Sequence, residues 1–209
     1  MMAIGPHKPD LGEGQVIKPH RPGLGEKLFF LISGAIMSVP FTLLAESLAN
    51  NLVSAGISEL FFAQVLSIAI IAPFVEEFAK VYPLFYRHGE TERSIFTLGF
   101  LVGLGFGIVE FFLYIFVYGA DIVPRLLPLI FHATNASIVA YGIATRRTVQ
   151  FYLIAVFLHF SNNFSALLGT FWSVGVFAAN AASYYLSWNL YYKTSDKRFS
   201  KGQSSPISY

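Results

Sequence analysis

The chain has 209 residues, of which 55% are apolar and only 12% are charged. Soluble domains carry about 25% charged residues, so this composition excludes an ordinary water-soluble globule and indicates an integral membrane protein. The net charge of +2 gives no basis for a nucleic-acid-binding surface. The absence of cysteine excludes disulfides, thiolate metal sites and cysteine nucleophiles.

Polar segments flank the apolar region and predict a flexible N-terminal arm over residues 1–27 and a polar C-terminal tail over residues 193–209. Residues 28–192 are predicted to form one all-α domain, a polytopic transmembrane helix bundle. A spanning helix needs about 20 apolar residues. Six stretches qualify: 28–49, 59–86, 94–118, 124–144, 149–169 and 171–192. The first is expected to end at Asn50-Asn51.

The basic residues predict the orientation of this bundle. With the N-terminus inside, 12 of the 14 Lys and Arg residues fall in inner segments, and Arg125 alone falls outside. Lys80 lies within a span. The positive-inside rule therefore places both termini in the cytoplasm.

Several ionisable groups lie inside the predicted spans, where each costs about 2.5–3.5 kcal/mol on insertion scales and marks a functional candidate. They are Glu46, Glu76, Glu77, Lys80, Glu110, His132 and His159, with Asn135, Asn162 and Asn163 beside the histidines. Glu46 is interpreted as snorkelling to the outer interface, and Glu59 as interfacial. At about 1.5 Å per residue, the others lie roughly 15–24 Å from the inner ends of four different spans. Groups at one depth on four helices predict a single site.

The spacing along each span supports this prediction. Lys80 lies one turn from both Glu76 and Glu77 and can pair with either. On the third span, Gly99, Gly103 and Gly107 lead to Glu110, a small-residue stripe that would press this carboxylate against a neighbouring helix. Pro73 is expected to kink the second span and to free a backbone carbonyl near the acidic pair.

These residue types can hydrolyse a peptide bond without Ser or Cys. A carboxylate can accept the proton of water, a histidine can share that water, and an asparagine amide can donate to the oxyanion. A structural role is the alternative for each group: a buried ion pair for Glu76, Glu77 and Lys80, and hydrogen bonds between helices for Glu110 and the His and Asn residues.

The motifs resemble those of PrsW-type intramembrane proteases, within the CAAX-protease and bacteriocin-processing superfamily. The residues that carry the resemblance are Glu76-Glu77-x-x-Lys80, Phe106-x-x-x-Glu110, His132 and His159-x-x-x-Asn163. Prenyl endopeptidases show a different pattern. Their basic residue is an Arg one position later than Lys80, and their second motif has His where this chain has Glu110.

The resemblance implies an endopeptidase of the prokaryotic cell membrane that cuts membrane-anchored proteins or peptides. By motif, Glu76 or Glu77 activates water, His132 and His159 orient it, and Asn163 completes the oxyanion hole, with Lys80, Glu110, Asn135 and Asn162 in support. The favoured mechanism has no metal, because Lys80 would oppose a cation and no His-Glu-x-x-His is present. Zinc is the alternative, with Glu77, His132 and His159 as its ligands.

A second function class fits the same groups. In a proton-coupled secondary transporter, the intramembrane Glu, Lys and His residues would form the relay. Such a protein would be expected to contain inverted repeats, and the sequence has no evident repeat. A non-catalytic scaffold that keeps the fold is a weaker possibility.

Overall fold

A computed structural model describes residues 21–56, 59–86, 91–169 and 173–196. Most of these residues are helical, and none of them belongs to a β-strand. The elements are α1 (Leu24–Ser54), α2 (Leu60–Gln64), the π-helix η1 (Val65–Ile71), α3 (Ala72–Tyr86), α4 (Glu92–Phe116), α5 (Ile122–Ala144), α6 (Thr148–Leu167) and α7 (Ser173–Lys193). The predicted all-α class is confirmed.

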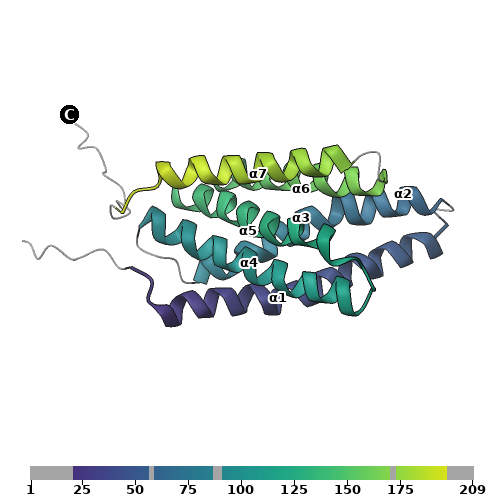
Figure 1. Cartoon of the computed structure of the whole chain (residues 1–209), viewed down its shortest axis with the longest axis horizontal. Helices are drawn as coiled ribbons and strands as arrows, with labels where there is room; N and C mark the ends of the chain where they lie inside the picture. The colour runs from purple at the N-terminus through teal and green to yellow at the C-terminus, as the bar shows by residue number, and fades with distance from the viewer. Residues whose placement is uncertain (1–20, 57–58, 87–90, 170–172, 197–209) are drawn as a thin grey trace, which may run out of the picture.

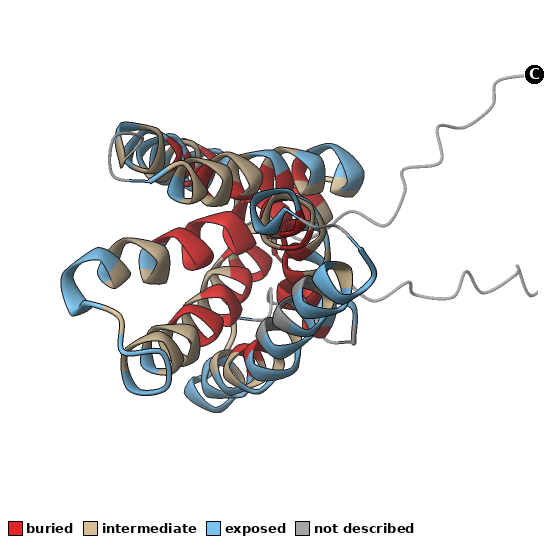
Figure 2. Cartoon of the chain, turned by 90° about the vertical axis from the view of Figure 1, so that its right-hand side faces the viewer, coloured by how far each residue is buried: buried red, intermediate tan, exposed pale blue. Residues whose placement is uncertain are grey.

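The helices lie side by side along the long axis of the molecule, and successive passes run in opposite directions (Figure 1). Segments α2, η1 and α3 follow one another without a break and form a single pass. Seen end-on, the buried residues lie on the inner faces of the helices and the exposed residues on the outer faces (Figure 2). Many exposed side chains are large and apolar, such as Ile36, Phe112 and Phe157, as expected for surfaces that face lipid.

In the described part of the chain, four helical passes are long and apolar enough to cross a membrane: Leu24–Phe41, Leu60–Phe85, Glu92–Phe116 and Ile122–Ala144. Helices α6 and α7 are similar in length to these passes, with 20 and 21 residues. They carry more polar side chains, such as His159 in α6 and Asn180 in α7. The count of six spans therefore stays a prediction.

The first predicted break is wrong. Helix α1 continues through Asn50-Asn51 to Ser54, because asparagine inside a helix does not by itself interrupt the backbone hydrogen bonds. The helix ends before Gly56, which has a φ of +102° that glycine adopts at no steric cost.

The first and last described segments meet at the same end of the bundle. Arg21 Nη2 lies 3.6 Å from Asp196 Oδ2, and Arg93 Nη1 lies 3.8 Å from the same oxygen. This arrangement fits an even number of passes. That this end of the bundle lies on the cytoplasmic side of the membrane stays a prediction. Residues 1–20 and 197–209, most of the predicted arm and tail, lie outside the described residues.

Glycine lets α4 pack closely against both of its neighbours. A Cβ at Gly103 would lie 2.7 Å from Ala136 Cβ and 2.8 Å from Ala133 Cα, both on α5. On the other side, Gly34 of α1 abuts the backbone of Val102, and Gly105 abuts that of Leu31. The predicted contact of the glycine stripe with a neighbouring helix is confirmed.

Candidate active site

Seven of the predicted site residues meet in the middle of the bundle. Helix α3 supplies Glu76, Glu77 and Lys80, α4 supplies Glu110, α5 supplies His132 and Asn135, and α6 supplies His159. Six of them are buried, and the side chain of Glu110 is 14% exposed. Their meeting bears out the expectation that groups at matching depth converge.

Glu77 is the most connected carboxylate of the cluster. Its Oε1 accepts from Lys80 Nζ at 2.8 Å, lies 2.7 Å from His159 Nδ1 and accepts a longer bond of 3.5 Å from Asn135 Nδ2. The side chain has no exposed surface. Glu77 is thus placed to fix the Lys80 and His159 side chains rather than to meet a water molecule.

Glu76 differs sharply from its neighbour. Its Oε2 lies 3.8 Å from both Lys80 Nζ and His159 Nε2, and it is a buried atom with no hydrogen-bond partner. Because His159 Nδ1 is bonded to Glu77, its Nε2 is the ring nitrogen left to face Glu76. The two adjacent carboxylates therefore differ in their contacts: Glu77 Oε1 is bound on several sides, whereas Oε2 of each residue is buried without a hydrogen-bond partner.

His132 is held in a similar way by Glu110. Its Nε2 forms a close ion pair with Glu110 Oε2, while its Nδ1 is buried without a hydrogen-bond partner. The two imidazole rings lie 5.4 Å apart between centroids and nearly perpendicular, at 77°. Each histidine thus has a carboxylate close to one ring nitrogen. The other nitrogen of His132 has no hydrogen-bond partner, and that of His159 lies 3.8 Å from Glu76 Oε2.

Glu76, His132 and His159 each offer one ligand atom, and these atoms lie within 4.8 Å of one another. We call these three residues the donor set. Two imidazoles and a carboxylate are a ligand combination that zinc takes in hydrolytic enzymes. The sequence had assigned the carboxylate position to Glu77, which instead binds Lys80 and His159.

Aromatic rings close the cluster on the side of α4 and α5. Lys80 Nζ lies 4.7 Å from the centroid of the Phe106 ring, and that ring lies 5.1 Å from the ring of His132. Phe131 packs edge-on against His159 at 5.6 Å. These rings exclude water from Lys80 and Glu77, so the interactions between their charges are stronger than at a surface.

The remaining two predicted residues make contacts elsewhere. Asn163 Nδ2 donates to the backbone carbonyl of Ile68 at 3.0 Å, and its Oδ1 accepts from Asn162 Nδ2. Asn162 Oδ1 in turn accepts from Asn180 of α7. In this arrangement the Asn163 amide stabilises a π-helical carbonyl and does not point its hydrogen bonds at the donor set.

The sequence missed the contribution of α7. Ser183 Oγ donates to Asn135 Oδ1 at 2.7 Å, which turns the Asn135 amide nitrogen toward Glu77 and the carbonyl of Ala155. Thr134 and Ser183 also share a hydrogen bond. A serine in a span carries no signal of its own, because a hydroxyl can satisfy itself on its own helix.

The two acidic residues assigned to interfaces are partly described. Glu59 is exposed and precedes the first residue of α2, in agreement with an interfacial position. The side chain of Glu46 lies outside the described residues.

A comparison with protein families gives one match for this chain. The model of the family described as PrsW family intramembrane metalloprotease matches residues 26–189. No curated protein and no solved structure matches the chain. The matched region contains every residue of the cluster.

Proposed function

This chain belongs to the PrsW family of intramembrane metalloproteases, and from that premise we propose which of its residues carry out the hydrolysis. The family makes the chain an integral membrane protein that hydrolyses peptide bonds of membrane-associated proteins, and it does not favour a transporter. The observation that carries our proposal is the buried donor set of Glu76, His132 and His159. The prokaryotic cell membrane as its location, and the wider superfamily, stay predictions.

We infer that the donor set holds a divalent metal ion such as zinc. Among the described residues, four buried side-chain atoms of the cluster have no hydrogen-bond partner, and two of them, Glu76 Oε2 and His132 Nδ1, belong to the donor set. Burying such atoms is costly unless something binds them. Glu77 and Glu110 each bond the other nitrogen of a histidine, as carboxylates do beside metal-bound imidazoles.

The charges of the cluster support the same inference. The cluster contains three carboxylates, those of Glu76, Glu77 and Glu110, and one ammonium group, that of Lys80, which lies near Glu76 and Glu77. With both imidazoles neutral the formal charge is −2, which one divalent cation balances. Isolated buried charge is too costly to leave uncompensated. Lys80 therefore does not exclude a cation, because Glu77 binds its ammonium at 2.8 Å.

A metal in this position supplies Lewis acidity toward a water molecule or a carbonyl oxygen. The residues of the chain supply orientation and proton transfer. Glu77 and Lys80 fix His159, and Glu110 fixes His132. Glu110 is the most exposed of these carboxylates, with 14% of its side chain exposed, so we propose it as the group that accepts a proton from water.

A metal-free glutamate mechanism, which the sequence favoured, is the second candidate. It is supported by the available Oε2 of Glu76, which would accept the proton of water in place of binding a metal.

One experiment separates these mechanisms. The purified chain is reconstituted in liposomes with a panel of single-span fluorogenic peptides, and bound metal is measured by mass spectrometry. Glu76→Gln and His159→Ala are compared with Glu92→Gln, a carboxylate variant at the far end of α4 where Glu92 binds Ser195. We expect stoichiometric zinc and cleavage in the wild type and in Glu92→Gln, and loss of both in the two site variants.

Other results have distinct meanings. Full cleavage after exhaustive removal of metal would contradict the metal site and favour the glutamate mechanism. Retained cleavage in Glu76→Gln and His159→Ala would contradict both mechanisms. No cleavage of any peptide by the wild-type chain would contradict the proposed activity itself.

A further inference from the structure

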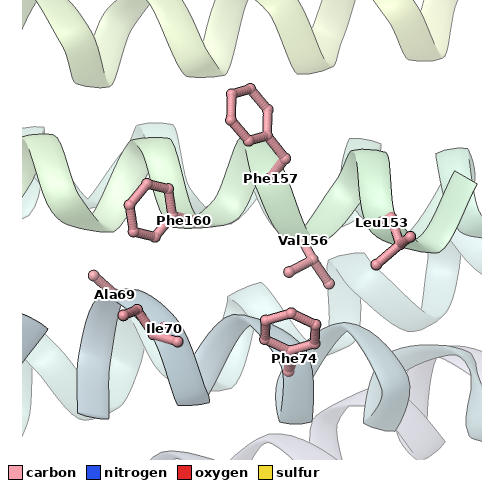
Figure 3. Close-up of a pocket in the computed structure, with 7 residues that line it drawn as sticks. All are labelled: Ala69, Ile70, Phe74, Leu153, Val156, Phe157 and Phe160. Carbon is pink, nitrogen blue, oxygen red and sulfur yellow. The ribbon is translucent and has the colours of Figure 1, made fainter. Parts of the chain in front are cut away.

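An apolar groove of about 220 Å³ lies between the second pass and α6. Ala69, Ile70 and Phe74 line it from η1 and α3, and Leu153, Val156, Phe157 and Phe160 line it from α6 (Figure 3). Ile70, Phe74 and Leu153 are 38–49% exposed. The groove is thus open on the lipid-facing side of the bundle.

Polar groups stand at both ends of this apolar groove. At one end, Asn163 Nδ2 donates to Ile68 O at 3.0 Å, and at the other, Tyr152 Oη donates to Phe74 O at 2.6 Å. Both donors belong to α6 and both acceptors to the backbone opposite. These hydrogen bonds join the two walls of the groove.

The carbonyl of Ile68 is available because of the π-helix and the proline that follows it. In η1 the backbone bonds run five residues back, as in the bond from Ala72 N–H to Ser67 O. The next residue in this register is Pro73, which has no N–H to give to Ile68. Pro73 thus leaves the carbonyl of Ile68 without this donor, and Asn163 binds it. Ile68 lies eight residues before Glu76, so this carbonyl is not the one predicted near the acidic pair.

The groove lies against the catalytic cluster. Phe74 is three residues from Glu77 on α3, and Val156 is three residues from His159 on α6, a spacing that places side chains next to each other on a helix. Val156 is 5% exposed and His159 2%. The wall that these two helices form therefore lies next to two members of the cluster, Glu77 and His159.

We propose that this groove binds the transmembrane segment of the substrate, in extended form, as it enters from the lipid between η1–α3 and α6. The inference rests on the proposed function, because it gives that function its substrate-binding site. A peptide bond in an intact helix is shielded by its own hydrogen bonds, so the segment must unwind before it is cut.

The polar ends of the groove favour a peptide over a lipid acyl chain. An unwound segment exposes N–H and C=O groups that lipid cannot satisfy. The Asn163 amide can both donate and accept, and the Tyr152 hydroxyl can do the same. An acyl chain would gain nothing from these groups, whereas a peptide backbone can exchange hydrogen bonds with them.

Photo-crosslinking tests the proposal directly. The photoreactive residue p-benzoylphenylalanine replaces Phe74 or Phe160 in the groove, and Phe112 of α4 or Phe177 of α7 as exposed controls on other faces. The probe is a biotinylated single-span peptide of leucine and alanine with a central glycine–serine break, in liposomes of phosphatidylcholine. We expect crosslinks to the peptide at Phe74 and Phe160 at least about tenfold above the two controls, which corresponds to a preference of about 1.4 kcal/mol.

A second measurement uses a groove-filling variant. Leu153→Trp is compared with Val149→Trp, which lies one turn earlier on α6 and outside the groove. We expect Leu153→Trp to raise KM about tenfold with kcat within about twofold, the pattern of lost substrate binding, and Val149→Trp to leave both unchanged.

The outcomes separate this inference from the proposed function. Cleavage by the wild type with crosslinks no stronger at Phe74 and Phe160 than at the controls would overturn the groove alone. Crosslinks only to lipid at the groove positions would also overturn it. Absence of cleavage by the wild type contradicts the proposed activity, while peptide crosslinks confined to the groove would still support binding there.

Discussion

Helices α4 and α6 both carry site residues, yet they are held by opposite means. Helix α4 contacts α5 through Gly103 and α1 through Gly105, with backbone close to backbone. Helix α6 faces η1 and α3 across an apolar groove, and side-chain hydrogen bonds from Asn163 and Tyr152 join the two walls.

The difference separates a fixed part of the site from one that can open. Close glycine packing gives extensive van der Waals contact and leaves few alternative positions for α4, so Glu110 and His132 are held rigidly. Two hydrogen bonds across a groove are individually weak, so α6 is joined to η1 less tightly than α4 is to its neighbours, although His159 of α6 stays bound to Glu77 of α3 at 2.7 Å. A protease needs both properties, because its catalytic groups must stay in place while a substrate enters.

The largest expected effect is at Lys80, which joins the two parts by binding Glu77 of α3 and lying over Phe106 of α4. Lys80→Met leaves a buried carboxylate without its charge partner, and we expect the free energy of unfolding to fall by about 3–5 kcal/mol. Unfolding in mixed micelles measures this change. The control, Lys193→Met at the exposed end of α7, should have little effect, and equal stability of both variants would show that Glu77 does not depend on the ammonium.

The second prediction concerns the rigid part alone. Gly103→Ala would place a methyl group 2.7 Å from Ala136 Cβ, and overpacking of this kind costs about 1–3 kcal/mol. Gly25→Ala, which meets no atom within 4 Å, serves as the control. Thermal unfolding should show a loss only for Gly103→Ala. If both variants unfold like the wild type, α4 and α5 are not in close contact.

Much of this arrangement could be predicted from the sequence because charge inside a membrane is rare. Glu76, Lys80, Glu110, His132 and His159 had to face one another, since lipid offers them no partner. The glycine stripe also predicted which face of α4 would meet a neighbour. Both arguments need only the position of each residue along its own helix.

The division of roles within the cluster could not be predicted in this way. Glu76 and Glu77 are adjacent in sequence, and only the placement of α6 decides that Glu77 lies 2.7 Å from His159 while Glu76 Oε2 lies 3.8 Å from it. Asn163 has a helical partner four residues away in His159, yet it binds Ile68 because the π-helix leaves that carbonyl without a donor. The role of Ser183 depends on contact between α5 and α7, which no local pattern encodes.

The third prediction tests whether α7 acts on the site through Asn135. Ser183→Ala removes the donor to Asn135 Oδ1, and we expect a loss of about 1 kcal/mol in stability. At the proposed metal site we expect a decrease of roughly tenfold in zinc affinity, as for groups behind metal ligands in other proteins. Ser187→Ala, which removes a hydrogen bond to Ser137 one turn away, should lose similar stability without the change in zinc affinity.

Rescue distinguishes a positioning role for Ser183 from a purely structural one. Ser183→Thr keeps the hydroxyl and should restore zinc affinity to near the wild-type value. An equal loss of zinc affinity in Ser183→Ala and Ser187→Ala would show that α7 only stabilises the bundle.

The smallest expected effect is at the hydrogen bond that closes one end of the groove. Tyr152→Phe removes the donor to Phe74 O, at a cost of about 0.5 kcal/mol, which corresponds to roughly a twofold increase in local opening. Hydrogen exchange should therefore rise in residues 65–74 and stay unchanged in α4. Tyr185→Phe, at a side chain that is 70% exposed on α7, should leave both regions as they are. An equal rise in α4 would mean that the two parts open together, and the groove would then not be an independently moving entrance to the site.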